Sequence, residues 1–212
     1  MIINKQKQTL SVIILLKKLY PDAHCALIHA NAFQLLVATI LSAQCTDDRV
    51  NIVTATLFRK YPTPQDYVNV SLEELTDDLK SINFFNNKAK SIKATAIKIV
   101  ENFGGEVPKK MDKLLTLNGV ARKTANVVLG NAFGIASGVV VDTHVSRLSQ
   151  RLGLTSETTP EKIEKDLIGL VPKKDWVIFP HWMIFHGRQV CKARNPNCAE
   201  CKFELICPKI GL

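Results

Sequence analysis

Two adjacent basic residues near the middle of the chain lie at the start of a predicted helix, where one of them could take part in a reaction. Arg122 and Lys123 follow an apolar turn of helix and a tight turn through Asn118-Gly119. A second helix starts there, and the unpaired N–H groups of its first turn attract a phosphate. Acidic residues are usual in that turn, so two cations need an explanation. They are either solvated surface residues or part of a helix-hairpin-helix that grips a DNA backbone and aims the Lys123 amine, a nucleophile when uncharged, at a sugar.

A carboxylate could complement that amine. Asp142 follows a loop rich in small residues (130–141) and precedes Thr143-His144-Val145. One interpretation is a helix N-cap. The other is a group facing Lys123 across a cleft, where it takes or relays a proton and stabilises positive charge on a sugar. Both roles are compatible, because a cap fixes the side chain.

Four cysteines crowd near the C-terminus as C-x6-C-x2-C-x5-C, namely Cys191, Cys198, Cys201 and Cys207. Such a thiolate quartet suits a tetrahedral zinc or a 4Fe–4S cluster. Zinc sites usually combine two close pairs of cysteines, so a single C-x2-C favours the cluster, with zinc as the alternative. Cations that could contact phosphates surround the quartet: Arg188, Lys192, Arg194 and Lys202. Cys25 and Cys45 are isolated and are interpreted as small core residues.

The composition favours a DNA-binding protein over a membrane protein. The 212 residues carry a net charge of +9 with 46% hydrophobic residues, which indicates a soluble chain with a polyanionic partner. The apolar run 10–16 is too short to span a membrane, and Val12, Leu16 and Leu19 place it on an amphipathic helix. We therefore expect a cytoplasmic protein.

The sequence predicts helices for nearly all segments that could position these groups. The expected helices run from Ala32 to Ser42, from Asp47 to before Tyr61, from Ser71, from Asn86 or Asn87 to Phe103, from Thr143 to about Leu152, from Pro160, and from about Lys174 to His186. Val139–Val141 is the best candidate for a strand, and it is short.

The ordered set of motifs resembles the endonuclease III family of DNA glycosylases. It comprises L-S-A-Q at 41–44, G-V-A-R-K-T-A-N-V-V at 119–128, V-D-T-H-V at 141–145, H-G-R at 186–188 and the cysteine quartet. Each motif is moderately specific alone, and their order is highly specific. Two positions depart from the family pattern: Asn118 replaces a proline and Ala121 replaces a glycine.

The resemblance implies an all-α fold with two lobes. One is a six-helix barrel over residues 25–135 with the helix-hairpin-helix at about 112–133. The other is a discontinuous domain of residues 1–24 and 136–212 that carries the cluster loop 191–207. The implied enzyme is a monomer in the bacterial cytoplasm, and its partner is duplex DNA containing damaged pyrimidines or abasic sites. It removes oxidised pyrimidines through a lysine Schiff base and cuts the strand by β-elimination.

Residue roles follow from the same resemblance. Lys123 matches the nucleophile and Asp142 the essential aspartate, while the four cysteines match the ligands of one 4Fe–4S cluster. Gln44 matches the residue that fills the gap left by an extruded nucleotide, and Phe84 falls where the family has an apolar wedge. The expected DNA contacts are Gln44, Phe84, Gly119, Ala121, Arg122, Thr124, Arg188, Lys192 and Arg194.

Two other functions are compatible with parts of the sequence. A mismatch-specific glycosylase of the same superfamily is one, although the adenine-mismatch and thymine-mismatch enzymes lack a lysine at position 123. A non-catalytic iron–sulfur protein for DNA binding or electron transfer is the other.

Overall fold

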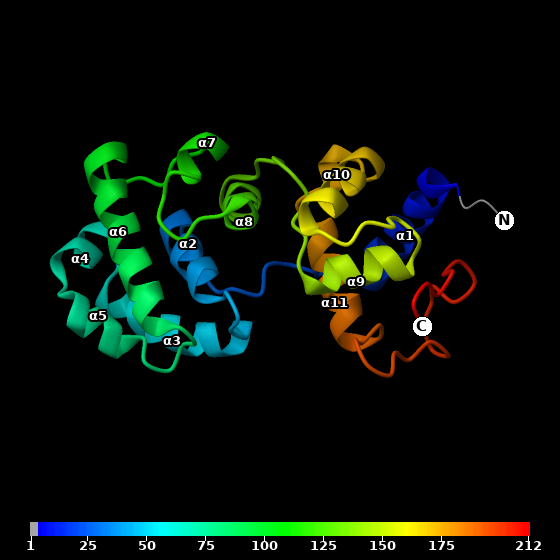
Figure 1. Ribbon diagram of the computed structural model, residues 1–212, viewed down its shortest axis with the longest axis horizontal. Helices are drawn as coiled ribbons and strands as arrows, with labels where there is room; N and C mark the ends of the chain where they lie inside the picture. The colour runs from blue at the N-terminus through cyan, green and yellow to red at the C-terminus, as the bar shows by residue number, and fades with distance from the viewer. Residues whose placement is uncertain (1–3) are drawn as a thin grey trace. The chain divides into compact units, whose positions relative to one another are not determined.

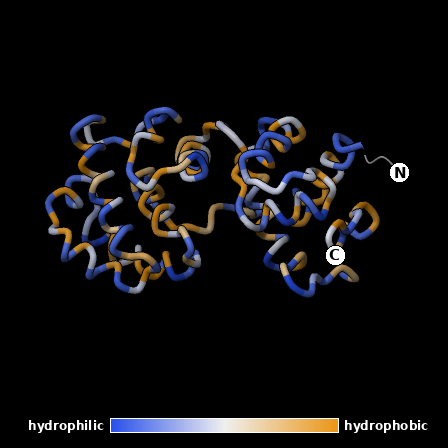
Figure 2. The backbone as a smooth tube through the Cα atoms, in the orientation of Figure 1, coloured by the Kyte–Doolittle hydropathy of each residue, from blue (hydrophilic) through white to orange (hydrophobic). Residues whose placement is uncertain are grey.

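The computed structural model describes residues 4–212. Every regular element in that range is a helix and there is no β-strand, which confirms the all-α fold. The chain divides into two compact units, Cys25–Ile135 and the N-terminal segment up to His24 together with Ala136–Leu212. Hydrophilic and hydrophobic residues alternate along the helices (Figure 2), the pattern of elements that are buried on one side.

The unit Cys25–Ile135 is built around a helix that is buried on nearly all sides. In α2 (Ala32–Leu41) every residue from Phe33 onward except Gln34 is buried. Such a helix is stable only inside a core. It contacts the longer helices α3 (Asp47–Lys60), α6 (Phe85–Phe103) and α8 (Arg122–Phe133), as Figure 1 shows. The short helices α4 (Pro64–Asn69) and α5 (Leu72–Asp78) pack on α6, and α7 (Met111–Leu114) packs on α8.

The other unit has its own core, formed by the two ends of the chain. Its helices are α1 (Lys5–Leu19), α9 (Thr143–Arg151), α10 (Pro160–Leu170), the 3-10 turn η1 (Lys173–Asp175) and α11 (Phe179–Gln189). Val12 and Leu16 of α1 are fully buried there, which confirms the amphipathic N-terminal helix. A Cβ on Gly187 would lie 2.7 Å from Nδ1 of His144, so this glycine allows α11 to approach α9.

Two sequence expectations need correction. The single helix expected from Lys174 to His186 is wrong, because η1 and α11 are separate and α11 continues to Gln189. Pro180 explains the break, since proline fits the first turn of a helix and disrupts its interior. The strand candidate Val139–Val141 is an irregular segment: Val139 and Val141 are buried, but no strand in the described range pairs with it.

Within the described part of the chain, no helix is both long enough and apolar enough to cross a bilayer.

Candidate functional site

The helix-hairpin-helix expected around Gly119 is present in the unit Cys25–Ile135. α7 ends at Leu114 and α8 begins at Arg122. Gly119 between them has φ +73°, a left-handed conformation that is strained for residues with a Cβ. A Cβ there would also lie 3.1 Å from Cβ of Ser91 on α6. The backbone conformation therefore favours glycine at this position, and the close approach of Ser91 adds to that preference.

Side chains of α6 hold the hairpin turn by donating hydrogen bonds to the backbone carbonyls of the turn. Oγ1 of Thr95 donates to the Asn118 carbonyl at 2.8 Å, and Nζ of Lys98 donates to the Thr116 carbonyl at 2.8 Å. Together with Ser91 these side chains occupy one face of α6, at i, i+4 and i+7. The bond to Asn118 uses only a main-chain atom. The turn therefore forms although asparagine replaces the family's proline.

Lys123 lies in the first turn of α8, at a helix end that has no side-chain cap. The N-cap is Ala121, whose extended backbone (φ −90°, ψ 172°) is allowed for any residue and does not require glycine. The alanine side chain cannot accept a hydrogen bond from the N–H groups of the first turn, so this helix end remains suited to an anion. Arg122 and Lys123 are exposed and Thr124 is half-buried. The structure thus combines two cations with an uncapped helix start.

Gln44 and Phe84 come together in the same unit. Both are exposed, and both have left-handed backbones, with φ +54° and +58°. Nδ2 of Asn83 donates to the Gln44 carbonyl at 2.7 Å and so connects the two loops. The two residues expected to enter the duplex therefore lie on adjoining loops.

Asp142 is the N-cap of α9 in the other unit. Its Oδ1 accepts a hydrogen bond from the Val145 N–H at 2.8 Å, which confirms the capping interpretation. The side chain is half-buried. Lys123 and Asp142 thus belong to different units of the chain.

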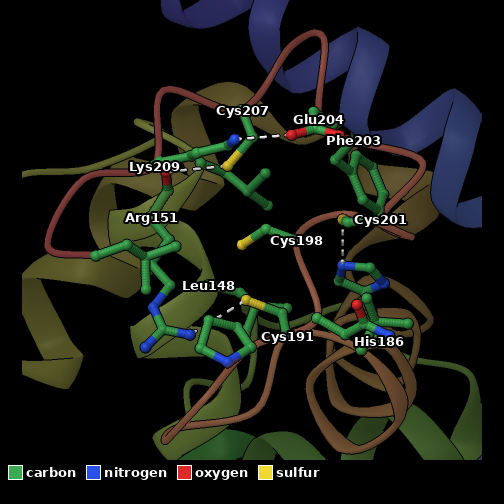
Figure 3. Close-up of a pocket in the computed structure, with 15 residues that line it drawn as sticks. Leu148, Arg151, His186, Cys191, Cys198, Cys201, Phe203, Glu204, Cys207 and Lys209 are labelled. Atoms are coloured by element: carbon green, nitrogen blue, oxygen red, sulfur yellow. Dashed lines mark hydrogen bonds and ion pairs between the residues drawn. The ribbon is translucent and has the colours of Figure 1, made fainter.

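The four clustered cysteines line one pocket. They lie in the irregular segment after α11, and their side chains surround a common space together with Leu148 and Phe203 (Figure 3). Burial raises the pKa of the thiols of Cys201 and Cys207, so the protein alone disfavours their thiolates. A bound cationic group would offset that cost.

Two side chains that sequence reasoning did not assign to this site contact its sulfur atoms. Nη1 of the buried Arg151 donates to Sγ of Cys191 at 3.3 Å and to the Lys192 carbonyl at 2.7 Å. Nε2 of His186 lies 3.6 Å from Sγ of Cys201, and Figure 3 shows both contacts. The position of His186 five residues before Cys191 is a weak sequence signal, and Arg151 gives none because it is distant in sequence.

The remaining expected residues are placed as follows. Arg188, Lys192, Arg194 and Lys202 are exposed around the cysteine segment. Cys25 and Cys45 pack partly buried against the core of the unit Cys25–Ile135, as expected.

Comparison with known proteins identifies the family. A family model described as "HhH-GPD superfamily base excision DNA repair protein" matches residues 37–173. Endonuclease III of Synechocystis sp. is 55% identical over 205 residues, covering 97% of this chain and 94% of that protein. Endonuclease III of Bacillus subtilis is 51% identical over 190 residues, covering 89% and 86%. The chain belongs to the endonuclease III family.

Solved endonuclease III structures agree with this assignment. The structure of a non-covalent endonuclease III–DNA complex has a TM-score of 0.93 and 45% identity, covering 98% of this chain and 97% of that one. A trapped covalent intermediate of endonuclease III with DNA gives the same values. A thermostable thymine-DNA glycosylase, at 21% identity and a TM-score of 0.85, shares the fold. This member of the endonuclease III family is a base-excision DNA repair enzyme, a glycosylase with lyase activity.

Proposed function

We propose that this enzyme removes oxidised pyrimidines from duplex DNA with Lys123 as the nucleophile, and then cuts the strand at the abasic site. The observation that carries the proposal is the exposed Lys123 in the first turn of α8, beside Arg122 and an uncapped helix end. Phosphate-binding N–H groups and an amine share one turn there. A strand bound to that turn brings its sugar within reach of the amine.

The proposed reaction uses one amine and one carboxylate of the protein. The neutral Nζ of Lys123 attacks C1′ of the sugar, the C1′–N bond breaks, and the base leaves with the electron pair of that bond. Loss of the proton from Nζ, with opening of the sugar ring, leaves an imine between the lysine and C1′. Removal of a C2′ proton then expels the 3′ phosphate by β-elimination. Water hydrolyses the imine and restores Lys123.

Asp142 supplies the negative charge for this sequence. We assign it to stabilise the positive charge that develops on the sugar and to accept the proton from Nζ. Its capping bond to Val145 fixes the direction of the carboxylate without occupying both oxygens. The cap therefore prepares the group for the reaction.

The cysteine pocket fits a 4Fe–4S cluster held by Cys191, Cys198, Cys201 and Cys207. The four thiols line one space, so one group could be bound by all of them. The spacing, with a single C-x2-C pair, favours the cluster over zinc. Arg151 and His186 complement thiolate charge. When bound, the cluster would hold a segment that has little apolar material of its own.

DNA recognition would extend over both units. Gln44, Phe84, Gly119, Ala121, Arg122 and Thr124 would contact the duplex from one unit, and Arg188, Lys192 and Arg194 from the other. The net charge of +9 supports a phosphate-dominated interface with steep salt dependence. We propose a monomer acting on damaged chromosomal DNA, which would place it in the bacterial cytoplasm.

Borohydride trapping tests the proposal. Wild-type protein is incubated with duplex DNA containing thymine glycol or an abasic site and then reduced. We expect a covalent adduct that Lys123→Gln abolishes and that Lys165→Gln, an exposed helical lysine of the other unit, leaves unchanged. Equal adduct from Lys123→Gln would reject the nucleophile. No adduct from wild type would favour a non-catalytic DNA-binding protein.

A further inference from the structure

We propose that Asn83 and Lys88 are positioning residues that hold Gln44 and Phe84 in the shape needed to open the duplex. The inference rests on the proposed function, because it concerns how the DNA-opening residues are held. It is carried by strained backbone, exposed side chains and three hydrogen bonds within the unit Cys25–Ile135.

The first observation is strain at two exposed positions. Gln44 and Phe84 have φ of +54° and +58°, where non-glycine residues are uncommon. Each such conformation is unfavourable and persists only where its surroundings over-determine it. Phe84 is also 61% exposed, so its ring contributes little to the core. Core packing therefore does not explain why the chain keeps these conformations.

The second observation is the bond between the two loops. Nδ2 of Asn83 donates to the Gln44 carbonyl at 2.7 Å, although the residues are 39 positions apart. Asn83 directly precedes Phe84, whose carbonyl accepts from the N–H groups of Asn87 and Lys88 at 3.1 Å. The loop of Gln44 is thus joined to the start of α6 at the position where Phe84 projects.

The third observation is a buried cation beneath the Gln44 loop. Lys88 is 7% exposed, and its Nζ donates to the carbonyls of Leu41 at 2.8 Å and Ala43 at 2.6 Å. Burial lowers the pKa of Lys88, because desolvation disfavours the charged amine. A buried ammonium is unfavourable unless hydrogen-bonded, and the C-terminal carbonyls of α2 provide such acceptors. This arrangement fixes the backbone on both sides of Ser42 immediately before Gln44.

These contacts give the loops a rigid shape before DNA binds. Unstacking a nucleotide costs a few kcal/mol, and ordering mobile side chains on binding would add to that cost. A wedge and a gap-filling residue that are already held avoid the second cost. Asn83 and Lys88 touch neither the base nor the sugar in this assignment, and act only through Gln44 and Phe84.

The test compares the single-turnover excision rates of each variant on two duplex substrates. In one substrate the lesion is normally paired. In the other the same lesion lies opposite an abasic gap, so little opening of the duplex is needed. Loss of one neutral hydrogen bond should slow Asn83→Ala by about three- to tenfold on the paired lesion. On the gapped substrate we expect no slowing. Equal slowing on both substrates, or none on either, would overturn the proposal.

Two matched controls separate positioning from stability. Asn51→Ala removes an asparagine that bonds the Ala26 carbonyl in the same unit. Lys93→Met removes an α6 lysine that donates to the carbonyls of Val68 and Val70. Neither should distinguish the two substrates, whereas Lys88→Met should. If Lys88→Met does not fold, Lys88→Arg is measured in its place.

A readout without chemistry separates this proposal from the proposed function. A 2-aminopurine beside a tetrahydrofuran abasic analogue reports unstacking when protein binds. We expect Asn83→Ala to lower the fluorescence amplitude and leave affinity for undamaged duplex unchanged. In a Gln44→Ala background the effect of Asn83→Ala should shrink. An unchanged amplitude would reject the positioning role even if Lys123 forms its adduct. A normal loss of amplitude without any adduct would reject only the lysine mechanism.

Discussion

Asp142 caps a helix and is also the proposed carboxylate of the reaction. Its Oδ1 caps α9 through the Val145 N–H at 2.8 Å. The two roles respond differently to substitution, because asparagine caps a helix about as well as aspartate but carries no charge. A conservative substitution can therefore separate fold from chemistry.

We predict that Asp142→Asn leaves the melting temperature nearly unchanged and lowers single-turnover excision at least a hundredfold, about 3 kcal/mol of activation free energy. Asp142→Ala should in addition lose about 1 kcal/mol of stability with the cap. Thermal melts and quenched-flow excision measure the two effects. Substantial activity in folded Asp142→Asn would contradict the assigned role.

Tyr20 contacts the His186 ring at the nitrogen opposite the cysteines. The Tyr20 hydroxyl lies 2.8 Å from Nδ1 of His186. Burial raises the pKa of Tyr20 to about 12, so the hydroxyl stays protonated and can donate to Nδ1. When Nδ1 accepts that bond, the ring proton resides on Nε2, which lies 3.6 Å from Sγ of Cys201.

We predict that Tyr20→Phe weakens this N–H···S contact without changing the helical content. We expect the variant to lose iron faster under oxidant, because such donors stabilise thiolates. The loss is measured as a fall in absorbance near 400 nm. Phe185, which packs on Tyr20, provides the control Phe185→Leu, which should keep the wild-type rate. Identical bleaching of Tyr20→Phe and wild type would show that the bond has no effect on the cluster.

Among the helices, α8 has an unfavourable first turn. Ala121 provides no cap, and two cations replace the acidic residues that a helix start favours. In other helices of the chain, such as α2, α3 and α5, a polar side chain accepts a bond from the first turn. Other helices, such as α6 and α10, also lack such a bond, but the start of α8 adds two adjacent cations and coincides with the proposed phosphate site.

We predict opposite effects of Ala121→Asp on stability and on DNA binding. The new cap should stabilise the protein by about 0.5–2 kcal/mol. Its charge would oppose the phosphate and weaken DNA affinity about tenfold or more. Thr159→Asp at the start of α10, another N-cap without a side-chain cap bond, makes the same charge change and should not affect affinity. Unchanged DNA affinity of Ala121→Asp would argue against phosphate binding at α8.

Local signals predicted most of the helices, and non-local contacts explain what was missed. The helix starts expected at Ala32, Asp47 and Ser71 are confirmed, and Asn31, Thr46 and Ser71 are the caps. The bonds of Asn83 and Lys88 join residues 39 to 47 positions apart. No spacing rule reveals such bonds. The left-handed conformations of Gln44 and Phe84 depend on the same contacts, so residue type alone did not predict them.

At the scale of the whole molecule, the two halves of the proposed reaction lie on separate units. Lys123 belongs to Cys25–Ile135 and Asp142 to the discontinuous unit. Motif order in the sequence predicted both residues. The segment after α11 has no regular element within the described residues, and Leu205 in it is 99% exposed. Phe203 and the cysteine pocket are among its contacts with the core of the unit.

We predict that removing the proposed cluster loosens this segment alone. Cys198→Ala, or iron chelation, should expose Lys192, Arg194 and Lys202 to trypsin and raise the cleavage rate about tenfold or more, because metal ligation would supply much of the order of a segment without helices. Circular dichroism should retain the helical signal, since the helices have their own cores. Unchanged proteolysis would show that the segment holds its shape without metal.

The bonds made by α6 have a consequence for how this enzyme can change. Lys88, Thr95 and Lys98 all donate to main-chain carbonyls of neighbouring loops. A main-chain acceptor survives almost any replacement of the loop residue that carries it. Side chains at Gln44 and in the hairpin turn can therefore be exchanged while the hydrogen bonds beneath them remain intact.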